Sequence, residues 1–330
     1  MFKICVIGCG GMSTGGHGPS FKKYYEDYKD VCLAACCDIN EEAALAYKEK
    51  FGFERCYTDY NEMLDKEKPD VVSLIVPVHL TKSMAIDIMK KGFNIILEKP
   101  PGKDVDEINE MIDEAQKSNV NVRVAFNRRY APLLIKLKEL IKESGEEITN
   151  ITYQMYRHNR RDKDFSTTAI HAIDAVKYIA EVDYKKVNLT YQNRFDVGEN
   201  VKNIYLECEL EKNIHAHIDL VPLSGAQIER ISLNTMNHTY FVQLPIQGCY
   251  DQPGEILHLK QKQLVEKIDG ASLVDSEAYF EGAGFYNENR LFFEHIRNNN
   301  EIICDLATAI QSVELEDCVR KSVDIYKKQI

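Results

Sequence analysis

The sequence predicts an α/β protein in which an N-terminal doubly wound parallel sheet precedes a C-terminal α+β domain with an open, mainly antiparallel sheet. Up to about residue 125, short apolar runs alternate with amphipathic segments, which is the pattern of βαβ units. Beyond residue 126, longer runs alternate polar and apolar residues, as an antiparallel sheet with one solvated face does. We therefore expect two domains, residues 1–125 and 126–330.

Local patterns predict the elements of the first domain. Its expected strands are residues 2–7, 31–37, 70–76, 94–98 and 120–126. Gly52 and Gly92 predict the ends of two intervening helices, 41–51 and about 80–91, because glycine readily adopts the left-handed C-cap conformation. Asp104, followed three residues later by Glu107, predicts the start of a further helix through a capping box.

The second domain is expected to be rich in strands. In one of them, Ile214, Ala216 and Ile218 alternate with polar residues and would face the core. The expected strands are 148–157, 186–196, 201–211, 213–221, 228–235 and 238–244, with helices at 131–143 and 167–180 and a helical tail from about Tyr286.

Composition and charge exclude several classes of partner. The formal net charge of −11 repels nucleic acid and acidic membranes, so we expect neither. No apolar run reaches the length of a signal-peptide core or a membrane span, which predicts a cytoplasmic protein. The ten cysteines form no C-x-x-C pair, so we expect reduced thiols and no metal site.

The stretch IGCGGMSTGGHG, directly after the first apolar run, resembles a dinucleotide-binding loop of a Rossmann domain. Gly8 and Gly10 occupy the first two glycine positions of G-x-G-x-x-G, whereas Ser13 occupies the third. Glycines there let the backbone turn tightly and approach a pyrophosphate at a helix N-terminus. We expect Gly8, Gly10, Gly11 and Met12 to line the cofactor.

Asp38 follows the second expected strand at about the distance from the loop that the Rossmann fingerprint requires. Its carboxylate could accept hydrogen bonds from the adenosine ribose hydroxyls. Alternatively, it could merely cap the helix that starts near Glu41. An acidic residue here favours NAD over NADP, because a 2′-phosphate would face a negative charge.

Lys99 ends the expected strand 94–98, and the carboxyl ends of strands in such sheets face the ligand crevice. A charged nicotinamide ring would lower the pKa of a neighbouring lysine and make it suitable as a proton relay. The alternative is an exposed lysine before a turn.

The chain resembles the glucose-fructose oxidoreductase, inositol dehydrogenase and rhizopine-catabolism (Gfo/Idh/MocA) family. The matching pieces, in order, are the glycine loop, Asp38-Ile39-Asn40, Tyr57-Thr58-Asp59-Tyr60, Glu98-Lys99-Pro100, Asn127-Arg128-Arg129-Tyr130 and His171-Ala172-Ile173-Asp174. The resemblance implies an NAD(P)-dependent oxidoreductase that transfers hydride between nicotinamide and a carbinol carbon of a sugar, cyclitol or related hydroxy compound. It also implies that Lys99 lies between nicotinamide and substrate, and that His171 contacts the substrate and assists proton transfer.

Further contacts follow from the same resemblance. The expected cofactor contacts are Ile39, Pro77, Glu98, Lys99 and Asn127, and the expected substrate contacts are Tyr156, Arg157, Thr167, Asp174 and Arg129.

Two departures from the family pattern bear on the chemistry. Polyol dehydrogenases of the family read D-x-x-x-H on the histidine helix, but here Thr167 takes the place of the aspartate. Threonine cannot orient a histidine by charge, so Asp174, three residues after His171, or Asp164 could substitute. In the segment after Pro77, Val78 replaces an asparagine that commonly meets the cofactor.

Two stretches leave alternatives open. The arginines of Tyr156-Arg157-His158-Asn159-Arg160-Arg161 could bind a carboxylate or phosphate, or could pair with Asp162 and Asp164 at a solvated strand end. In the glycine loop, relatives have a histidine one position earlier than His17. A one-residue insertion would explain this and Ser13, with Gly15 or Gly16 providing close backbone approach.

The family also contains enzymes that use tightly held NAD for glycoside elimination or epimerisation, and non-catalytic regulatory proteins that bind the cofactor. Both remain alternatives to a dehydrogenase. The open sheet is expected to form a homodimer or homotetramer. The particular small-molecule substrate is not encoded in a recognisable motif.

Overall fold

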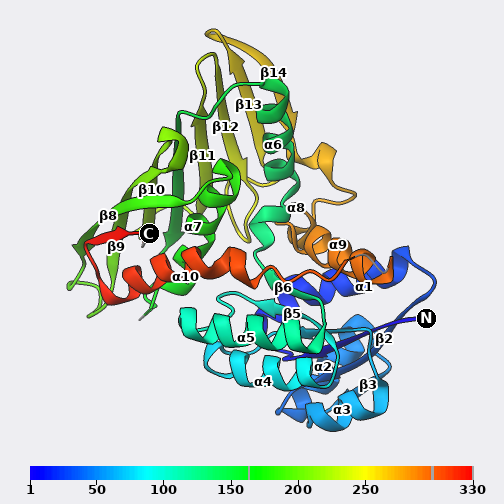
Figure 1. Ribbon diagram of the computed structural model, residues 1–330. Helices are drawn as coiled ribbons and strands as arrows, with labels where there is room; N and C mark the ends of the chain where they lie inside the picture. The colour runs from blue at the N-terminus through cyan, green and yellow to red at the C-terminus, as the bar shows by residue number, and fades with distance from the viewer. Residues whose placement is uncertain (163, 299–300, 329–330) are drawn as a thin grey trace. The chain divides into compact units, whose positions relative to one another are not determined.

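The computed structural model describes residues 1–162, 164–298 and 301–328, which form two compact units (Figure 1). The first unit contains Met1–Phe126 and Phe285–Ile310, and the second contains Asn127–Gly284 and Gln311–Ile330. The first boundary lies one residue from the predicted one. The predicted second domain needs a correction, because residues 285–310 belong to the first unit.

The first unit is built on a six-stranded sheet with only parallel pairings among its described strands, which confirms the predicted parallel sheet and adds one short strand to the five expected ones. The strand order is β3-β2-β1-β4-β5-β6, so the direction of winding reverses between β1 and β4. The strands are β1 (Phe2–Ile7), β2 (Val31–Cys37), β3 (Arg55–Tyr57), β4 (Val71–Leu74), β5 (Asn94–Glu98) and β6 (Val122–Ala125). Ligands bind at such a reversal in doubly wound sheets.

Helices connect these strands, and the sequence correctly marks the start of α5 and the end of α2. Asp104 caps α5 by accepting a hydrogen bond from the backbone N–H of Glu107 at 3.0 Å, as predicted. Gly52 ends α2 in the left-handed conformation, with φ of 84°. The helices are η1 (Ser13–His17), α1 (Gly18–Asp27), α2 (Glu41–Phe51), α3 (Tyr60–Glu67), α4 (Val78–Lys90) and α5 (Val105–Ser118).

Helix α9 (Phe285–Arg297) returns to the first unit and packs along α1 (Figure 1). Phe292 and Phe293 are fully buried in the core of this unit. The ring of Phe293 lies 5.2 Å from that of Tyr24 and 5.9 Å from that of Phe2. This aromatic packing explains why residues 285–310 leave the second unit, and it pairs segments too distant in sequence to be recognised from local patterns.

The second unit is built on a nine-stranded sheet of order β14-β13-β12-β11-β7-β10-β9-β8-β15. Only the pairing of β7 with β10 is parallel among the described pairs of this sheet, which confirms the mainly antiparallel prediction. The strands are β7 (Asn150–His158), β8 (Tyr184–Asn193), β9 (Lys202–Leu210), β10 (His215–Ser224), β11 (Ile228–Asn234), β12 (His238–Leu244), β13 (Glu255–Lys260), β14 (Gln263–Asp269) and β15 (Ile325–Lys327).

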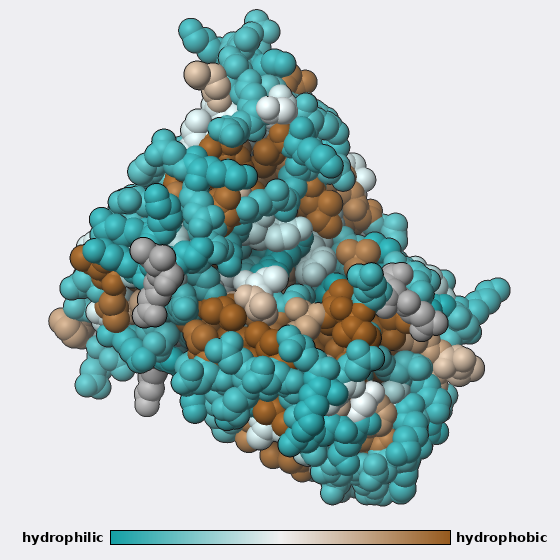
Figure 2. All heavy atoms as spheres, in the orientation of Figure 1, coloured by the Kyte–Doolittle hydropathy of each residue, from teal (hydrophilic) through white to brown (hydrophobic). Residues whose placement is uncertain are grey.

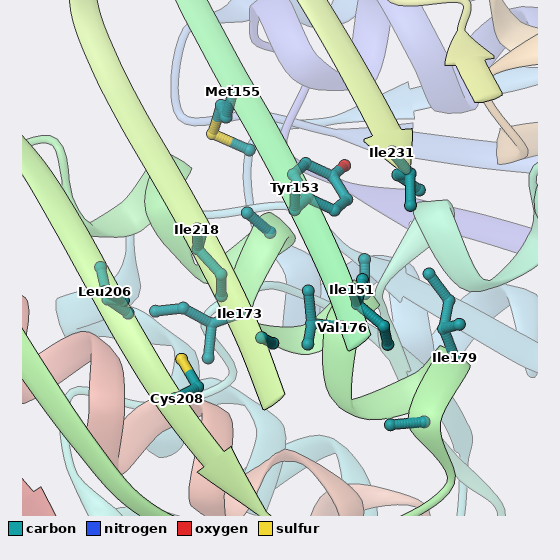
Figure 3. Packing of buried hydrophobic residues seen from close by; sticks show 14 of the residues in the cluster. Ile151, Tyr153, Met155, Ile173, Val176, Ile179, Leu206, Cys208, Ile218 and Ile231 are labelled. Carbon is teal, nitrogen blue, oxygen red and sulfur yellow. The ribbon is translucent and has the colours of Figure 1, made fainter. Parts of the chain in front are cut away.

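Helix α7 (Ser166–Ala180) covers one face of this sheet. Its Ile173, Val176 and Ile179 lie with inward-facing residues of the strands, including Tyr153 and Ile218 (Figure 3). The other helices are η2 (Asn127–Tyr130), α6 (Pro132–Ser144), η3 (Glu211–Asn213), η4 (Gly270–Leu273) and α8 (Tyr279–Gly282), while α10 (Leu306–Lys321) runs from the first unit into the second.

The face of the molecule shown in Figure 2 is mostly hydrophilic, with hydrophobic residues exposed in patches, as expected of a chain with 28% charged residues. Across the described part of the chain, every helix is too short or too polar for a membrane span. Binding of another subunit to the open sheet stays a prediction.

The assignment of α9 to the first unit is testable by truncating its buried ring. Phe293→Ala should lower the free energy of unfolding of this unit by about 3–5 kcal/mol, because a large cavity replaces a fully buried side chain. Leu291→Ala, at a position 38% exposed on the same helix, should cost far less. Urea unfolding followed by circular dichroism measures both, and equal effects would contradict the packing.

Candidate active site

The predicted cofactor residues of the first unit gather at one edge of the parallel sheet. The glycine loop follows β1, Asp38 follows β2, Pro77 follows β4 and Lys99 follows β5. Because all strands are parallel, these carboxyl ends lie at the same edge. The structure therefore brings together the cofactor residues predicted in these loops, at the point where the strand order reverses.

Gly8 makes the closest backbone approach of the loop. Its φ is 99°, and a Cβ at this position would lie 2.0 Å from the carbonyl oxygen of Ile75. Its N–H donates to the carbonyl of Cys37 at 2.8 Å. Any residue other than glycine would be both strained and in collision with the backbone after β4.

Gly10 and Gly11 differ from Gly8, because a Cβ at either position would meet no protein atom within 4 Å. Both are exposed, and Met12 beside them is 44% exposed. The helix begins here, so its first N–H groups lack carbonyl partners within the helix and carry the positive end of its dipole. This open cradle at a helix N-terminus fits the pyrophosphate of a dinucleotide.

Asp38 is held against the glycine loop. Its Oδ2 accepts a hydrogen bond from the backbone N–H of Cys9 at 2.8 Å, and its Oδ1 accepts one from the N–H of Asn40 at 2.9 Å. Asn40 is the residue that caps α2, through a bond from the N–H of Ala43, so the alternative role of Asp38 as the cap is wrong. The next residue, Ile39, is 95% exposed. A carboxylate fixed beside the loop suits a ribose.

The segment Ser13–His17 forms a π-helix at the start of α1. A π-turn takes up one more residue than an α-turn, as the predicted insertion requires. Ser13 is fully buried and donates to the hydroxyl of Tyr47 at 2.9 Å. A Cβ on Gly16 would lie 2.7 Å from the ring of Phe285, whereas one on Gly15 would meet nothing within 4 Å. Gly16 therefore makes room for Phe285 of α9, and a close approach of Gly15 or Gly16 to a pyrophosphate stays a prediction.

The π-turn places His17 against Glu98 at the end of β5. His17 Nε2 lies 2.9 Å from Glu98 Oε1, and the backbone N–H of Lys99 donates to Glu98 Oε2 at 3.0 Å. Burial by itself would raise the pKa of Glu98, but the hydrogen bond from His17 and the positive charge of Lys99 outweigh it and lower this pKa. Lys99 is partly buried, and its peptide bond to Pro100 is cis.

In the second unit, His171 lies on α7 and is 7% exposed. Thr167, one helical turn earlier, is partly buried. Asp164, one of the two possible substitutes for the missing aspartate, is exposed and accepts a hydrogen bond from the N–H of Ser166 at 2.9 Å. Its carboxylate therefore accepts a hydrogen bond from the first residue of α7.

Asp174, the other possible substitute, is buried and paired with Arg129. The guanidinium donates to both carboxylate oxygens, at 2.8 and 2.5 Å, and Ser312 donates to Oδ1 at 3.1 Å. Two residues predicted to bind substrate thus neutralise each other inside the second unit. Their contact with a substrate stays a prediction.

One arginine of the run takes an expected role, and another takes a role that was not expected. Arg160 pairs with Asp162 at 2.6 Å, as the solvated alternative predicted. Arg157 is instead buried and donates to Glu229, as does Arg128 at 2.7 Å. The Tyr153 hydroxyl also donates to Glu229 at 2.7 Å. The guanidinium of Arg157 is therefore occupied by an internal carboxylate.

Burial by itself would raise the pKa of Glu229, but the charges of Arg128 and Arg157 lower it well below its usual range. Side chains alternate along β11, so Glu229 lies on the same face as the apolar Ile231 and Leu233. This pattern indicates a buried acidic residue, which was not predicted from the sequence.

Tyr156 was predicted to contact the substrate and Asn127 the cofactor, and both lie in the second unit. Tyr156 lies on the opposite face of β7 from Tyr153 and hence from α7, and it accepts a hydrogen bond from Gln154 at 3.2 Å. The sheet therefore separates Tyr156 from His171. Asn127 is buried, with its amide nitrogen donating to the carbonyl of Ala283 at 2.8 Å.

Comparisons with known proteins agree with this geometry. Residues 2–126 match the model of an oxidoreductase family with an NAD-binding Rossmann fold (GFO_IDH_MocA). The chain is 29% identical over 140 residues to myo-inositol 2-dehydrogenase of Thermotoga maritima, covering 42% of this chain and 40% of that protein. It is 30% identical over 139 residues to D-glucoside 3-dehydrogenase of Escherichia coli, covering 42% and 38%. The chain thus spans about two fifths of the length of these curated relatives.

Solved structures extend the likeness to the whole fold. A levoglucosan dehydrogenase in complex with NADH superimposes with a TM-score of 0.81 at 17% identity, covering 100% of both chains. An oxidoreductase domain protein from Kribbella flavida gives 0.84 at 14% identity, also covering 100% of both. At such identities the likeness establishes the fold alone.

The fold and the match to the family model define the first unit as an NAD-binding Rossmann domain. The match of residues 2–126 to this family's model confirms, for the first unit, the resemblance found in the motifs.

The open space at Gly10 provides a test of the cofactor site. Gly10→Val should leave the melting temperature nearly unchanged, because its Cβ meets no protein atom, yet raise the Kd for NADH at least about tenfold by filling the cradle. Gly15→Ala is the matched control, since its Cβ is equally unobstructed but lies in the π-turn. Unchanged NADH affinity in Gly10→Val, measured by fluorescence titration, would refute this site.

Proposed function

We propose that the protein is an NAD(H)-dependent oxidoreductase that transfers hydride between nicotinamide and a carbinol carbon of a sugar, cyclitol or related hydroxy compound. The observation that carries the proposal is Lys99, anchored through Glu98 at the same sheet edge as the glycine loop and Asp38. Relatives named myo-inositol 2-dehydrogenase, D-glucoside 3-dehydrogenase and glucose-6-phosphate 3-dehydrogenase support this substrate class.

The chain's own residues would bind the cofactor and move the proton. A bound nicotinamide would supply the hydride acceptor. The loop around Gly10 would bind the pyrophosphate, and Asp38 would accept hydrogen bonds from the ribose hydroxyls. Lys99 and His171 would take the hydroxyl proton as the carbinol is oxidised and return it in the reverse direction.

The fixed carboxylate of Asp38 supports NAD as the cofactor over NADP. Its oxygens accept hydrogen bonds from Cys9 and Asn40, which holds a negative charge where a 2′-phosphate would lie. This arrangement would repel the phosphate and favour two free hydroxyls.

Comparative titration tests the cofactor choice. We expect NADH to bind at least about tenfold more tightly than NADPH, because the phosphate meets a carboxylate. Asp38→Asn retains an acceptor oxygen but removes the negative charge. It should therefore reduce the difference in affinity between NADH and NADPH. Equal affinity of the wild-type protein for both cofactors would exclude the proposed role of Asp38.

Turnover tests the role of Lys99. Lys99→Met keeps much of the side-chain length but removes the amine, and it should lower kcat by about 10²- to 10⁴-fold while NADH still binds. Lys103→Met is the matched control, because this lysine pairs with Glu107 at 3.0 Å and is 57% exposed. The substrate comes from a screen of sugars, uronates and cyclitols.

The alternatives give different outcomes in the same screen. Turnover without net change in cofactor absorbance would indicate elimination or epimerisation with held NAD. Micromolar NADH binding with no turnover of any compound would favour a regulatory protein. Thr167, which replaces the family aspartate, is the feature that keeps both in consideration.

A further inference from the structure

His17 is held between two partners in the interior of the first unit. Its Nε2 faces Glu98 Oε1 at 2.9 Å, and its Nδ1 faces the amide nitrogen of Asn289 at 3.2 Å. His17 is 1% exposed and Asn289 is fully buried. Asn289 belongs to α9, so the returning segment reaches a residue that contacts the Glu98-Lys99 motif.

These contacts determine which ring nitrogen of His17 carries the proton. The Asn289 amide nitrogen also donates to the carbonyl of Phe285 at 2.8 Å, and a carbonyl can only accept, so the orientation of the amide is fixed. The amide nitrogen is a donor only, so His17 Nδ1 must accept from it. The proton of a neutral imidazole then lies on Nε2 and is donated to Glu98.

Packing prevents the ring from turning away. The imidazole stacks on Phe21, with ring centroids 5.9 Å apart, and meets the edge of Phe285 at 5.2 Å. Gly16 leaves room for the Phe285 ring, since a Cβ there would collide with it at 2.7 Å. The π-turn, the missing side chain and α9 together fix the imidazole.

Glu98 receives one hydrogen bond on each oxygen, from His17 and from the backbone of Lys99. His17 and Lys99 are the titratable groups whose interactions most lower the pKa of this carboxylate. A buried carboxylate stays ionised only when such partners compensate its lost hydration. Removal of His17 leaves the backbone bond and the lysine charge against the full cost of burial.

We infer that Asn289 and His17 are positioning residues that keep Glu98 ionised, so that Lys99 retains a negative counter-charge beside it. Neither residue touches the reacting atoms; both act through Glu98. The counter-charge offsets the repulsion between Lys99 and a positively charged nicotinamide, and it keeps the ammonium close to the sheet edge. The inference rests on the proposed function only in assigning proton transfer to Lys99.

Nuclear magnetic resonance of the cofactor-free protein tests the inference without a substrate. The ¹⁵N shifts of His17 should show a proton on Nε2, which faces Glu98, and none on Nδ1, which faces the Asn289 amide. The carboxyl ¹³C resonance of Glu98, assigned by its loss in Glu98→Gln, should titrate below the ordinary glutamate pKa. A wild-type ring protonated on Nδ1 overturns the inference, whatever any variant does.

Variants then separate positioning from simple packing. His17→Phe keeps a ring but no donor, and it should raise the pKa of Glu98 by at least about one pH unit. Asn289→Asp should give an imidazole that is protonated on both nitrogens, and it should keep Glu98 ionised. This effect on Glu98 is the opposite of the one expected for His17→Phe. Asn287→Ala, on α9 but bonded to Arg290, should change neither signal. An unchanged Glu98 titration in His17→Phe overturns the inference.

The pH dependence of kcat/KM tests whether the contact between His17 and Glu98 affects catalysis. Once a substrate is found, the acidic limb of kcat/KM in His17→Phe should move upward with the pKa of Glu98, while the Kd for NADH stays within a few fold. An acidic limb that stays in place while Glu98 titrates at higher pH overturns the link to Lys99. Lack of turnover by the wild-type protein rejects the proposed function instead, because the magnetic resonance results stand without it.

Discussion

A largely buried carboxylate at the end of β5 is the constraint on which the carboxyl edge of the parallel sheet depends. Glu98 can remain ionised there only if hydrogen bonds replace its lost water, and the bond from His17 does so at 2.9 Å. To bring His17 to this place, the chain uses a π-turn after the glycine loop. Gly16 then admits Phe285 against the turn, which ties α9 to the same edge.

In the second unit, Glu229 is another carboxylate whose burial is compensated by hydrogen bonds and positive charges. Arg128, Arg157 and Tyr153 surround this fully buried carboxylate, and Arg129 similarly satisfies Asp174. Breaking such a pair leaves an uncompensated charge, which typically costs about 3–5 kcal/mol. Arg157 and Arg129 were both predicted to bind a ligand, but each pairs with a buried carboxylate of the second unit and so stabilises its packing.

The elements with strong local patterns could be predicted from the sequence. The strands Phe2–Ile7 and Val31–Cys37 and the helix Glu41–Phe51 match their predicted bounds, because continuous apolar runs and a glycine C-cap mark them. The hairpin of β13 and β14 was missed. Strand β14 buries one of its seven residues, Ile268, so it shows no alternation. The position of the glycine loop, Asp38 and Lys99 at one edge followed from the parallel sheet.

By itself, the sequence determined the class of fold, the dinucleotide loop and the order of the motifs, because these depend on local periodicity and on glycine geometry. Only the tertiary structure decided the partners of the charged residues. Asn289 and His17 are 272 positions apart, Arg128 and Glu229 are 101 apart, and Arg129 and Asp174 are 45 apart. Hydrogen bonds across such separations leave no periodic trace in a single sequence, since packing alone brings these groups within reach.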